Sequence, residues 1–260
     1  MCIYCENRRP LRRLFLLGRF CASIRLYSKS AKGNIMQNAA MAAALPLEEW
    51  QNKFEQKALQ LYPASDPSHD ILHIRRVVRM ARKLAAAEGA DIRVVEPAAW
   101  FHDCVIVAKN DPRRAQASRL SADAAVGMLR DMGYDPALFD AIHHAIAAHS
   151  YSAAITPETV EAKIVQDADR LDGLGAIGIA RCFTVGALLS RPFYQDGDIL
   201  AARRAPDDKA QTIDHFFVKL FKTVDTLQTA AGRAEGARRA AFMRDYLARF
   251  AAEAGEDAGN

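Results

Sequence analysis

From residue 47 onward, apolar side chains recur every three or four residues, and this period restricts the chain to helices. The clearest case lies between Pro67 and Gly89. One helical face there carries Ile71, Ile74, Val77, Val78, Ala81, Leu84 and Ala85. Asp66 and Pro67 suit the N-cap and first position of this helix, and Gly89 its end. No stretch alternates apolar and polar residues as a half-buried strand does, so the sequence predicts an all-α fold.

The same pattern predicts a multi-helix bundle within one domain at residues 41–255. Besides the helix before Gly89, the predicted helices cover 47–62, 92–107, 115–132, 136–149, 157–172, 176–190, 209–228 and 233–252. The helix at 92–107 is almost wholly apolar, and we expect it at the centre of the bundle. A segment rich in Pro, Gly and Asp at 191–208 predicts a loop. The chain has no internal repeat and no glycine-rich phosphate loop.

Residues 1–35 differ from the rest of the chain in charge. They hold eight of the 35 Lys and Arg residues but only one of the 31 Asp and Glu residues, so the remaining chain is slightly acidic. This segment resembles an organelle transit peptide, and a start codon read too far upstream, with Met36 or Met41 as the true start, also explains it. We treat residues 1–40 as a basic leader outside the fold. The acidic body argues against a nucleic-acid polymer as partner.

Cysteine usage and hydropathy indicate the compartment. Cys2, Cys5 and Cys21 lie in the leader, which leaves Cys104 and Cys182 in apolar surroundings. Cys2 and Cys5 form a lone CxxC without a partner pair, so a zinc site there is not expected. No apolar run approaches the ~18 residues of a membrane span. The sequence therefore predicts a cytoplasmic protein without disulfides or a membrane partner.

Two histidine motifs interrupt the apolar pattern. His69 and His73 are four residues apart and share one face of a helix. His102 and Asp103 are adjacent and lie in a long apolar run. Each motif alone suits a plainer role, the first as exposed or capping histidines and the second as a hydrogen-bonded pair inside the core. A buried charged pair is nevertheless costly unless something compensates it.

Three aspartates lie on the apolar helix predicted at 157–172. Asp169 and Asp172 are three residues apart and share a face, whereas Asp167 and Asp169 point about 200° apart. A solvated acidic face is the plain explanation, but apolar neighbours such as Ile164 indicate burial on more than one side. Two imidazoles and two carboxylates from three helices suit a divalent transition ion. Such an ion would compensate the buried carboxylates.

Together these motifs resemble those of the HD-domain superfamily of metal-dependent phosphohydrolases. The order His73, His102-Asp103, Asp169 matches the family's H…HD…D pattern. Five local sequences are similar to those of small bacterial members: SHDILHIRRV, FHDCVIVAKN, AIAAHSYSA, EAKIVQDADRLDGLGAIGIAR and DDKAQTIDHF. The resemblance covers about residues 47–250. The HD pair alone is a weak signal, whereas the ordered set with QDADRLD is specific.

The resemblance implies a metal site built by His73, His102, Asp103 and Asp169. It implies a divalent ion (Mn, Ni, Co, Zn, Fe or Mg), and we favour one ion per chain. His69 lies one turn before His73. The family pattern puts the ligand directly before xxRV, so His69 is assigned to substrate binding or to support of the ligands, although a ligand role stays open.

Two further histidines bear on the number of metal ions. Some HD enzymes hold a second metal with two more histidines, one of them near the start of the helix after the HD loop, and that region has no histidine here. His144 and His149 are five residues apart, about 140° around a regular helix, so they share one site poorly. We expect His149 to contact substrate phosphate or bound water as a catalytic residue. A helix-surface position is favoured for His144.

The loop after the HD pair carries three cations, Lys109, Arg113 and Arg114. They suit either a solvated basic loop or a clamp that binds substrate phosphate, because Arg and Lys stabilise charge on phosphoryl oxygens. We assign Lys109 to catalysis and the two arginines to substrate binding. Many HD nucleotidases place an acid/base carboxylate just after the HD pair. The sequence from Cys104 to Val107 has none, which leaves the general base open.

These expectations combine into a reaction. A metal-activated water would attack phosphorus in a phosphate or pyrophosphate ester, with a nucleotide as the best substrate class and Asp103 both binding the metal and orienting the water. Two other classes stay open: an HD-type metal oxygenase, which generally needs two irons and more histidines, and a non-catalytic metal- or nucleotide-binding module. The oligomeric state, the exact substrate and the metal are not readable from the sequence.

Overall fold

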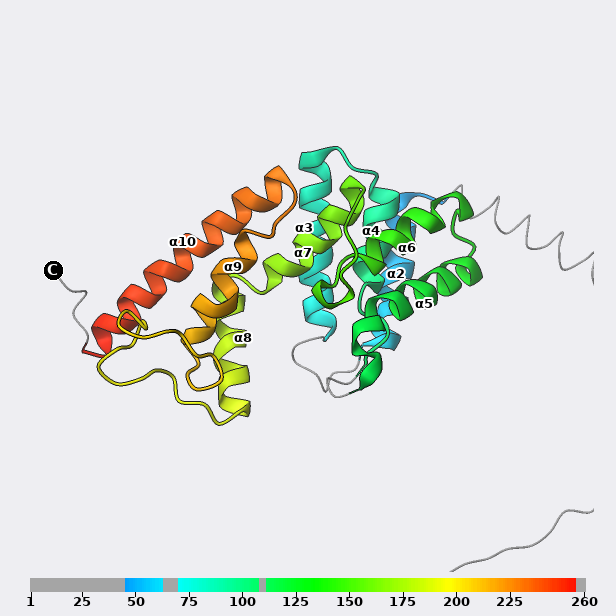
Figure 1. The fold of residues 1–260 in the computed structure, drawn as a ribbon. Coiled ribbons are helices and arrows are strands. Elements are labelled where there is room, and N and C mark those ends of the chain that lie inside the picture. The colour runs from blue at the N-terminus through cyan, green and yellow to red at the C-terminus, as the bar shows by residue number, and fades with distance from the viewer. Residues whose placement is uncertain (1–44, 63–69, 108–110, 256–260) are drawn as a thin grey trace, which may run out of the picture.

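The computed structural model describes residues 45–62, 70–107 and 111–255, and every regular element in that part of the chain is helical (Figure 1). The α-helices are α2 (Leu47–Leu61), α3 (Ile71–Glu88), α4 (Ile92–Phe101), α5 (Ala117–Met132), α6 (Phe139–Ala147), α7 (Val160–Asp172), α8 (Gly175–Leu188), α9 (Phe221–Val224) and α10 (Ala230–Glu253). Three short 3-10 turns are Pro112–Gln116, Pro136–Leu138 and Tyr151–Ala153, and Phe216–Leu220 is π-helical. The predicted all-α class is confirmed. The leader at 1–40, His69 and Lys109 lie outside the described residues.

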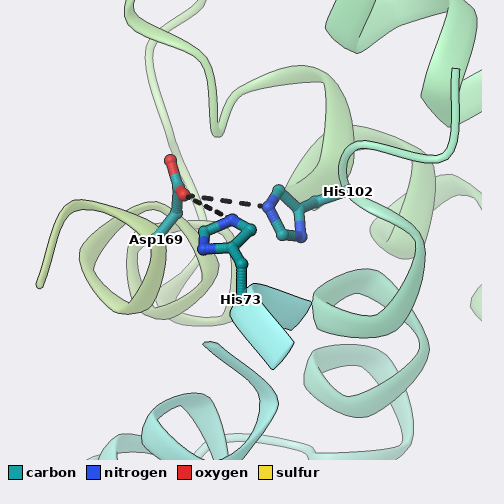
Figure 2. Close-up of side chains that lie close together, drawn as sticks. All are labelled: His73, His102 and Asp169. Atoms are coloured by element: carbon teal, nitrogen blue, oxygen red, sulfur yellow. Dashed lines mark ion pairs between the residues drawn. The ribbon is translucent and has the colours of Figure 1, made fainter. Parts of the chain in front are cut away.

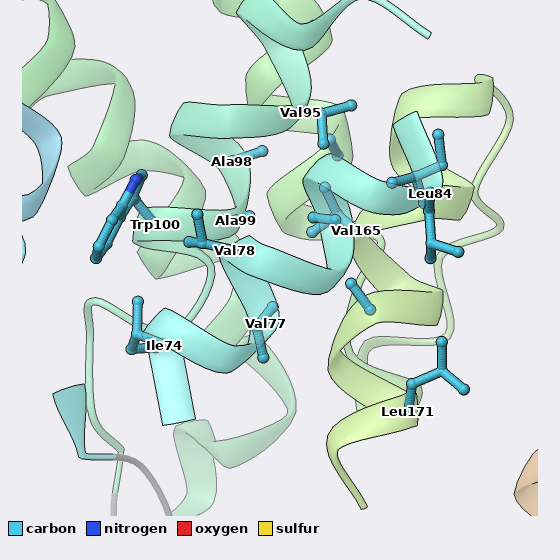
Figure 3. Close-up of a cluster of buried hydrophobic side chains, with 14 of the residues drawn as sticks. Ile74, Val77, Val78, Leu84, Val95, Ala98, Ala99, Trp100, Val165 and Leu171 are labelled. Atoms are coloured by element: carbon cyan, nitrogen blue, oxygen red, sulfur yellow. The ribbon is translucent and has the colours of Figure 1, made fainter. Parts of the chain in front are cut away.

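The core forms where α3, α4, α6 and α7 pack against one another. Figure 3 shows its centre, where side chains of α3, α4 and α7 such as Val77, Ala98 and Val165 meet with no exposed surface. Helices α8, α9 and α10 gather on one side of this group, and α10 also packs on α3 and α7 (Figure 1). Among the described helices, none alone is long and apolar enough to cross a membrane; α7 and α8 reach that length and composition only as a pair bent by 60°.

Helix α4 is built around a proline that its surroundings tolerate. Pro97 lies inside the helix and has no N–H to donate to the carbonyl of Arg93. The hydroxyl of Tyr134 donates to that carbonyl instead, at 2.7 Å. Asp91 caps the start of the helix by accepting from the backbone N–H of Arg93. These contacts fix the helix that carries the HD pair at its end.

Helix α4 ends at Phe101, so the predicted extension to residue 107 is wrong. Carbonyl groups of its last turn accept hydrogen bonds from a side chain and from the turn that follows. The carbonyl of Trp100 accepts from the Tyr62 hydroxyl at 2.9 Å, and that of Phe101 accepts from the N–H of Cys104 at 3.2 Å. The apolar run therefore continues as a turn, and the HD pair lies at the end of the helix, with His102 as its C-cap.

The helix predicted at 209–228 is wrong at both ends. Residues 214–224 are helical, with a π-helical segment at Phe216–Leu220. The backbone N–H groups of Thr212 and Ile213 bond instead to the carbonyls of Pro192 and Phe193, in the loop predicted at 191–208. Buried Asp214 accepts from Arg204 Nη2 at 2.9 Å. These long-range contacts fix the backbone of residues that the sequence period had assigned to one continuous helix.

Candidate metal centre

Three helices bring His73, His102 and Asp169 together (Figure 2). His73 lies in the first turn of α3, His102 directly after α4, and Asp169 near the end of α7. Asp169 Oδ1 lies 3.5 Å from His73 Nε2 and 3.8 Å from His102 Nε2. Both histidines are buried, whereas 30% of the Asp169 side chain is exposed. The cluster is therefore closed to solvent at the two histidines and accessible at Asp169.

A second group of ligand atoms shares His102. Asp103 Oδ2 lies 3.7 Å from His102 Nε2, and Asp103 Oδ1 lies 3.4 Å from His149 Nε2. Within each of the two groups, His73–His102–Asp169 and His102–Asp103–His149, the ligand atoms lie within 4.8 Å of one another. Bonds of about 2.0–2.1 Å to one ion separate neighbouring ligand atoms by roughly 3–3.5 Å, so both groups have the dimensions of a metal site.

Hydrogen bonds set the tautomer of all three histidines. Each Nδ1 atom lies within hydrogen-bond distance of an acceptor oxygen: Asp172 Oδ2 for His73 (2.8 Å), the Ala99 carbonyl for His102 (3.0 Å) and the Ile146 carbonyl for His149 (2.6 Å). Because a carbonyl or carboxylate oxygen cannot donate, each Nδ1 carries a proton, and the ring in its neutral form presents a lone pair at Nε2. Three Nε2 lone pairs therefore converge on two carboxylates.

The electrostatics of the cluster favour a bound cation. His102 Nε2 is fully buried and has no hydrogen-bond partner in the described structure. Burial lowers the pKa of His102, so its ring stays neutral and able to bind a metal. Burial also lowers the pKa of His149, but the carboxylates of Asp103 and Asp169 outweigh it and the net pKa is raised. The site thus favours positive charge on the side of His149.

His149 lies outside the helix that the sequence predicted for it. Helix α6 ends at Ala147, and His149 follows in a turn. The expected separation of 140° from His144 assumed one regular helix and does not apply. His144 Nε2 instead accepts from the backbone N–H of Glu158, at 3.0 Å, and this contact leads away from the cluster. The expectation that His144 has a structural position on the helix surface agrees with this contact.

Asp172 is the residue next to the cluster that sequence reasoning did not assign. It shares a face of α7 with Asp169, as its spacing indicated, and contacts the far side of the His73 ring. Arg76 and Arg181 also donate to its carboxylate. Burial raises the pKa of Asp172, but the hydrogen bonds from His73 and Arg76 outweigh it and hold the net pKa well below its ordinary value. The i, i+3 spacing to Asp169 was the only signal of its position.

Asp167 points away from the cluster, as the helical geometry predicted. Its carboxylate accepts from the backbone N–H groups of Gln228 and Thr229, both at 2.8 Å, and from the Thr229 hydroxyl at 2.7 Å. Thr229 is the N-cap of α10. Asp167 therefore joins α7 to the start of α10 and has a structural role.

The two arginines assigned to substrate binding are held by other contacts. Arg113 Nη2 donates to Asp111 at 2.8 Å, and Arg114 Nη1 donates to the carbonyl of Val107 at 2.8 Å. Both lie in or beside the loop that follows the HD pair, so Arg114 braces that loop. Lys109, in the same loop, is outside the described residues, as is His69.

Cys104 takes the position directly after the HD pair. Its Sγ donates to the carbonyl of Ser121 at 3.4 Å, and burial raises the pKa of the thiol to about 12. A thiol with such a pKa stays protonated at neutral pH. Cys104 is therefore no substitute for the acid/base carboxylate that this position lacks.

The fold and the cluster define a class of all-α proteins in which α3, α4 and α7 bring histidines and carboxylates together into a candidate metal site. Residues 71–174 match the HD domain family. The Bacillus subtilis protein YpgQ is 31% identical over 183 residues, which are 69% of this chain and 81% of YpgQ. The chain belongs to the HD-domain superfamily, as the sequence motifs indicated.

Solved structures agree with this assignment. The crystal structure of YpgQ in complex with ADP has a TM-score of 0.62 and 29% identity, and the match covers 79% of this chain and 95% of that chain. An HD-superfamily hydrolase from Bacillus thuringiensis has a TM-score of 0.63 and 29% identity, with 79% and 97% covered. Both matches span nearly the whole of the solved chains.

Proposed function

We propose that this protein is a metal-dependent phosphohydrolase that cleaves a phosphate or pyrophosphate ester of a nucleotide. The observation that carries the proposal is the buried Nε2 atom of His102, which has no hydrogen-bond partner and faces the carboxylates of Asp103 and Asp169. A buried polar atom without a partner is costly, and a metal ion would satisfy it. The names of HD-superfamily relatives support hydrolysis.

The proposed ligands are His73, His102, Asp103 and Asp169, around one divalent ion. Mixed imidazole and carboxylate ligation suits Mn, Fe, Co, Ni or Zn better than Mg, which prefers oxygen ligands. Both ligand groups need the single lone pair of His102, and one lone pair binds one ion at a time. This sharing supports one tightly bound ion per chain.

Each remaining residue has a role in the proposed reaction. When bound, the ion polarises a phosphoryl oxygen and makes coordinated water more acidic. Asp103, with one oxygen near His102 and the other near His149, orients the attacking water, and His149 contacts that water or the phosphate. Lys109 stabilises negative charge on the phosphoryl group, and His69, Arg113 and Arg114 bind the rest of the substrate.

Two observations support the substrate class and the compartment. A YpgQ structure contains ADP, which supports a nucleotide as the small-molecule partner. Cys104 and Cys182 are free thiols, which supports the reducing, cytoplasmic location expected from the sequence.

The proposal is tested by phosphate and pyrophosphate release from a panel of nucleotides, with chelator-treated protein and each divalent metal in turn. We expect turnover that depends on metal and is lost in His102→Ala, because a supporting group cannot replace a direct bond to the ion. His144→Ala is the matched control and should keep full activity, since its ring bonds to Glu158. Full metal content and turnover in His102→Ala would contradict the proposal. Metal binding without turnover of any nucleotide would favour the binding module.

A further inference from the structure

We infer that Asp172 is a positioning residue for the metal centre, which fixes the orientation and tautomer of His73 from the side opposite the ligand cluster. This inference rests on the proposed function, because it requires that His73 binds the metal ion. Asp172 belongs to neither of the two groups of ligand atoms. Its effect on the site passes through His73.

The carboxylate of Asp172 is held by donors from three directions. Asp172 Oδ2 accepts from His73 Nδ1 at 2.8 Å and from Arg181 Nη1 at 2.9 Å. Arg76 forms a bidentate contact, from Nε to Oδ1 at 2.6 Å and from Nη2 to Oδ2 at 3.0 Å. Only 4% of the Asp172 side chain is exposed. An ion pair with this many bonds and this little solvent holds a fixed geometry.

This geometry determines which nitrogen of His73 faces the ligands. A carboxylate that accepts from three cationic or N–H donors keeps the proton on His73 Nδ1. The lone pair at Nε2 then points to Asp169, 3.5 Å away. A carboxylate behind a metal-binding imidazole also makes the ring a stronger electron donor. Asp172 therefore sets both the direction and the basicity of one ligand.

His73 depends on a side chain in a way that His102 and His149 do not. The Nδ1 atoms of those two rings donate to backbone carbonyls three residues earlier, which no substitution of a side chain removes. His73 lies within the first turn of α3, and its Nδ1 contact is with a residue 99 positions away. Loss of Asp172 would leave the ring of His73 without its orienting acceptor.

The test measures metal affinity of the full chain by calorimetric titration with Mn²⁺, and the visible absorption spectrum of the Co²⁺-loaded protein. We expect Asp172→Ala to weaken metal binding about 10–100-fold, as is usual for groups that orient a metal-binding histidine. Asp172→Asn keeps the shape and one acceptor oxygen but loses the charge, so its affinity should lie between those of the wild type and Asp172→Ala. The Co²⁺ spectrum should change in both variants because His73 is reoriented.

Asp167→Asn is the matched control, since Asp167 lies on the same helix, is equally buried and faces α10. It should lower the melting temperature and leave the metal affinity of the folded protein unchanged. Wild-type affinity and spectrum in both Asp172 variants would overturn the inference while leaving the proposed function intact. The same reduction of affinity in Asp167→Asn as in Asp172→Asn would also overturn it, because the effect would then be general destabilisation. A wild-type protein that binds no metal would refute the proposed function itself.

Discussion

The rings of His102 and His149 meet edge to face, with centroids 4.9 Å apart and an interplanar angle of 82°. Each ring follows the end of a helix, α4 or α6, and bonds back to the carbonyl three residues before it. The Nε2 atoms of both rings therefore face the same carboxylate, that of Asp103. Substitution of His149 therefore tests whether its ring binds a metal ion or contacts the attacking water or the phosphate.

We predict that His149→Ala lowers kcat by roughly 100-fold or more and keeps one metal ion per chain. The reason is that His149 is assigned to water or phosphate, and loss of one general acid–base or orienting group has an effect of this size. Metal analysis after gel filtration, together with steady-state kinetics, checks both parts. Loss of metal as complete as in His102→Ala would instead make His149 a ligand.

Lys109→Ala should reduce kcat/KM by about tenfold or more, which corresponds to roughly 1.4 kcal/mol of transition-state stabilisation. The melting temperature should barely change, since exposed substitutions usually shift stability within about 0.5 kcal/mol. Lys83→Ala is the control, because that lysine is 68% exposed on α3 and belongs to neither ligand group. Normal kinetics with a clear drop in melting temperature would make Lys109 structural.

Cys104→Ala should keep activity within about twofold, and the pH–rate profile should be the same as that of the wild type. Burial raises the thiol pKa to about 12, so this group does not ionise between pH 6 and pH 10 and contributes no limb to the profile. Kinetics across that range check the prediction. Disappearance of a limb in the variant would show that the thiol titrates and takes part in the reaction.

Gly232→Ala should lower stability, by on the order of 1–3 kcal/mol, because it crowds the junction between α7 and α10. A Cβ at Gly232 would lie 2.3 Å from Asp167 Oδ2 and 2.7 Å from Thr229 Oγ1. Gly127→Ala is the contrasting control: its Cβ meets nothing within 4 Å, and alanine favours the helix by about 1 kcal/mol. Urea denaturation measures both, and equal effects of the two changes would contradict the prediction.

A chain that starts at Met41 should unfold and turn over like the full chain, since the helical pattern in the sequence begins at residue 47. Thermal melting and kinetics of the two chains check this. A large loss of either property in the shorter chain would show that the leader packs on the body.

The sequence period predicted the helices that bury one apolar face, because the residues of such a face recur every three or four positions. The predicted start of α3 at Asp66 and Pro67 is wrong, because Asp70 caps the helix and Ile71 is its first residue. Periodicity failed where polar contacts from distant residues decide the backbone. Helix α4 stops at Phe101 because Tyr62 and a turn take up its carbonyls, and no pattern within 92–107 encodes Tyr62.

The sequence likewise predicted some residues of the candidate site and not others. The motif order pointed to His73, His102 and Asp169, which come together as expected. The spacing argument separated His149 from His144 on the assumption that the helix continued past Ala147. Asp172 shared a readable face with Asp169, but its contact with His73 joins residues 99 positions apart and depends on the packing of α3 against α7.

The number of residues that separates each histidine from the acceptor of its Nδ1 atom has a consequence for folding. His102 and His149 acquire their orientation from carbonyls three residues away, as soon as the ends of α4 and α6 form. His73 acquires its orientation only when the chain closes a loop of 99 residues, which is entropically costly and slow. Two of the imidazoles are thus oriented by local contacts, and the third is oriented only where α3 packs against α7. A metal ion that needs all the ligands would bind the finished fold selectively and add its binding energy to that state alone.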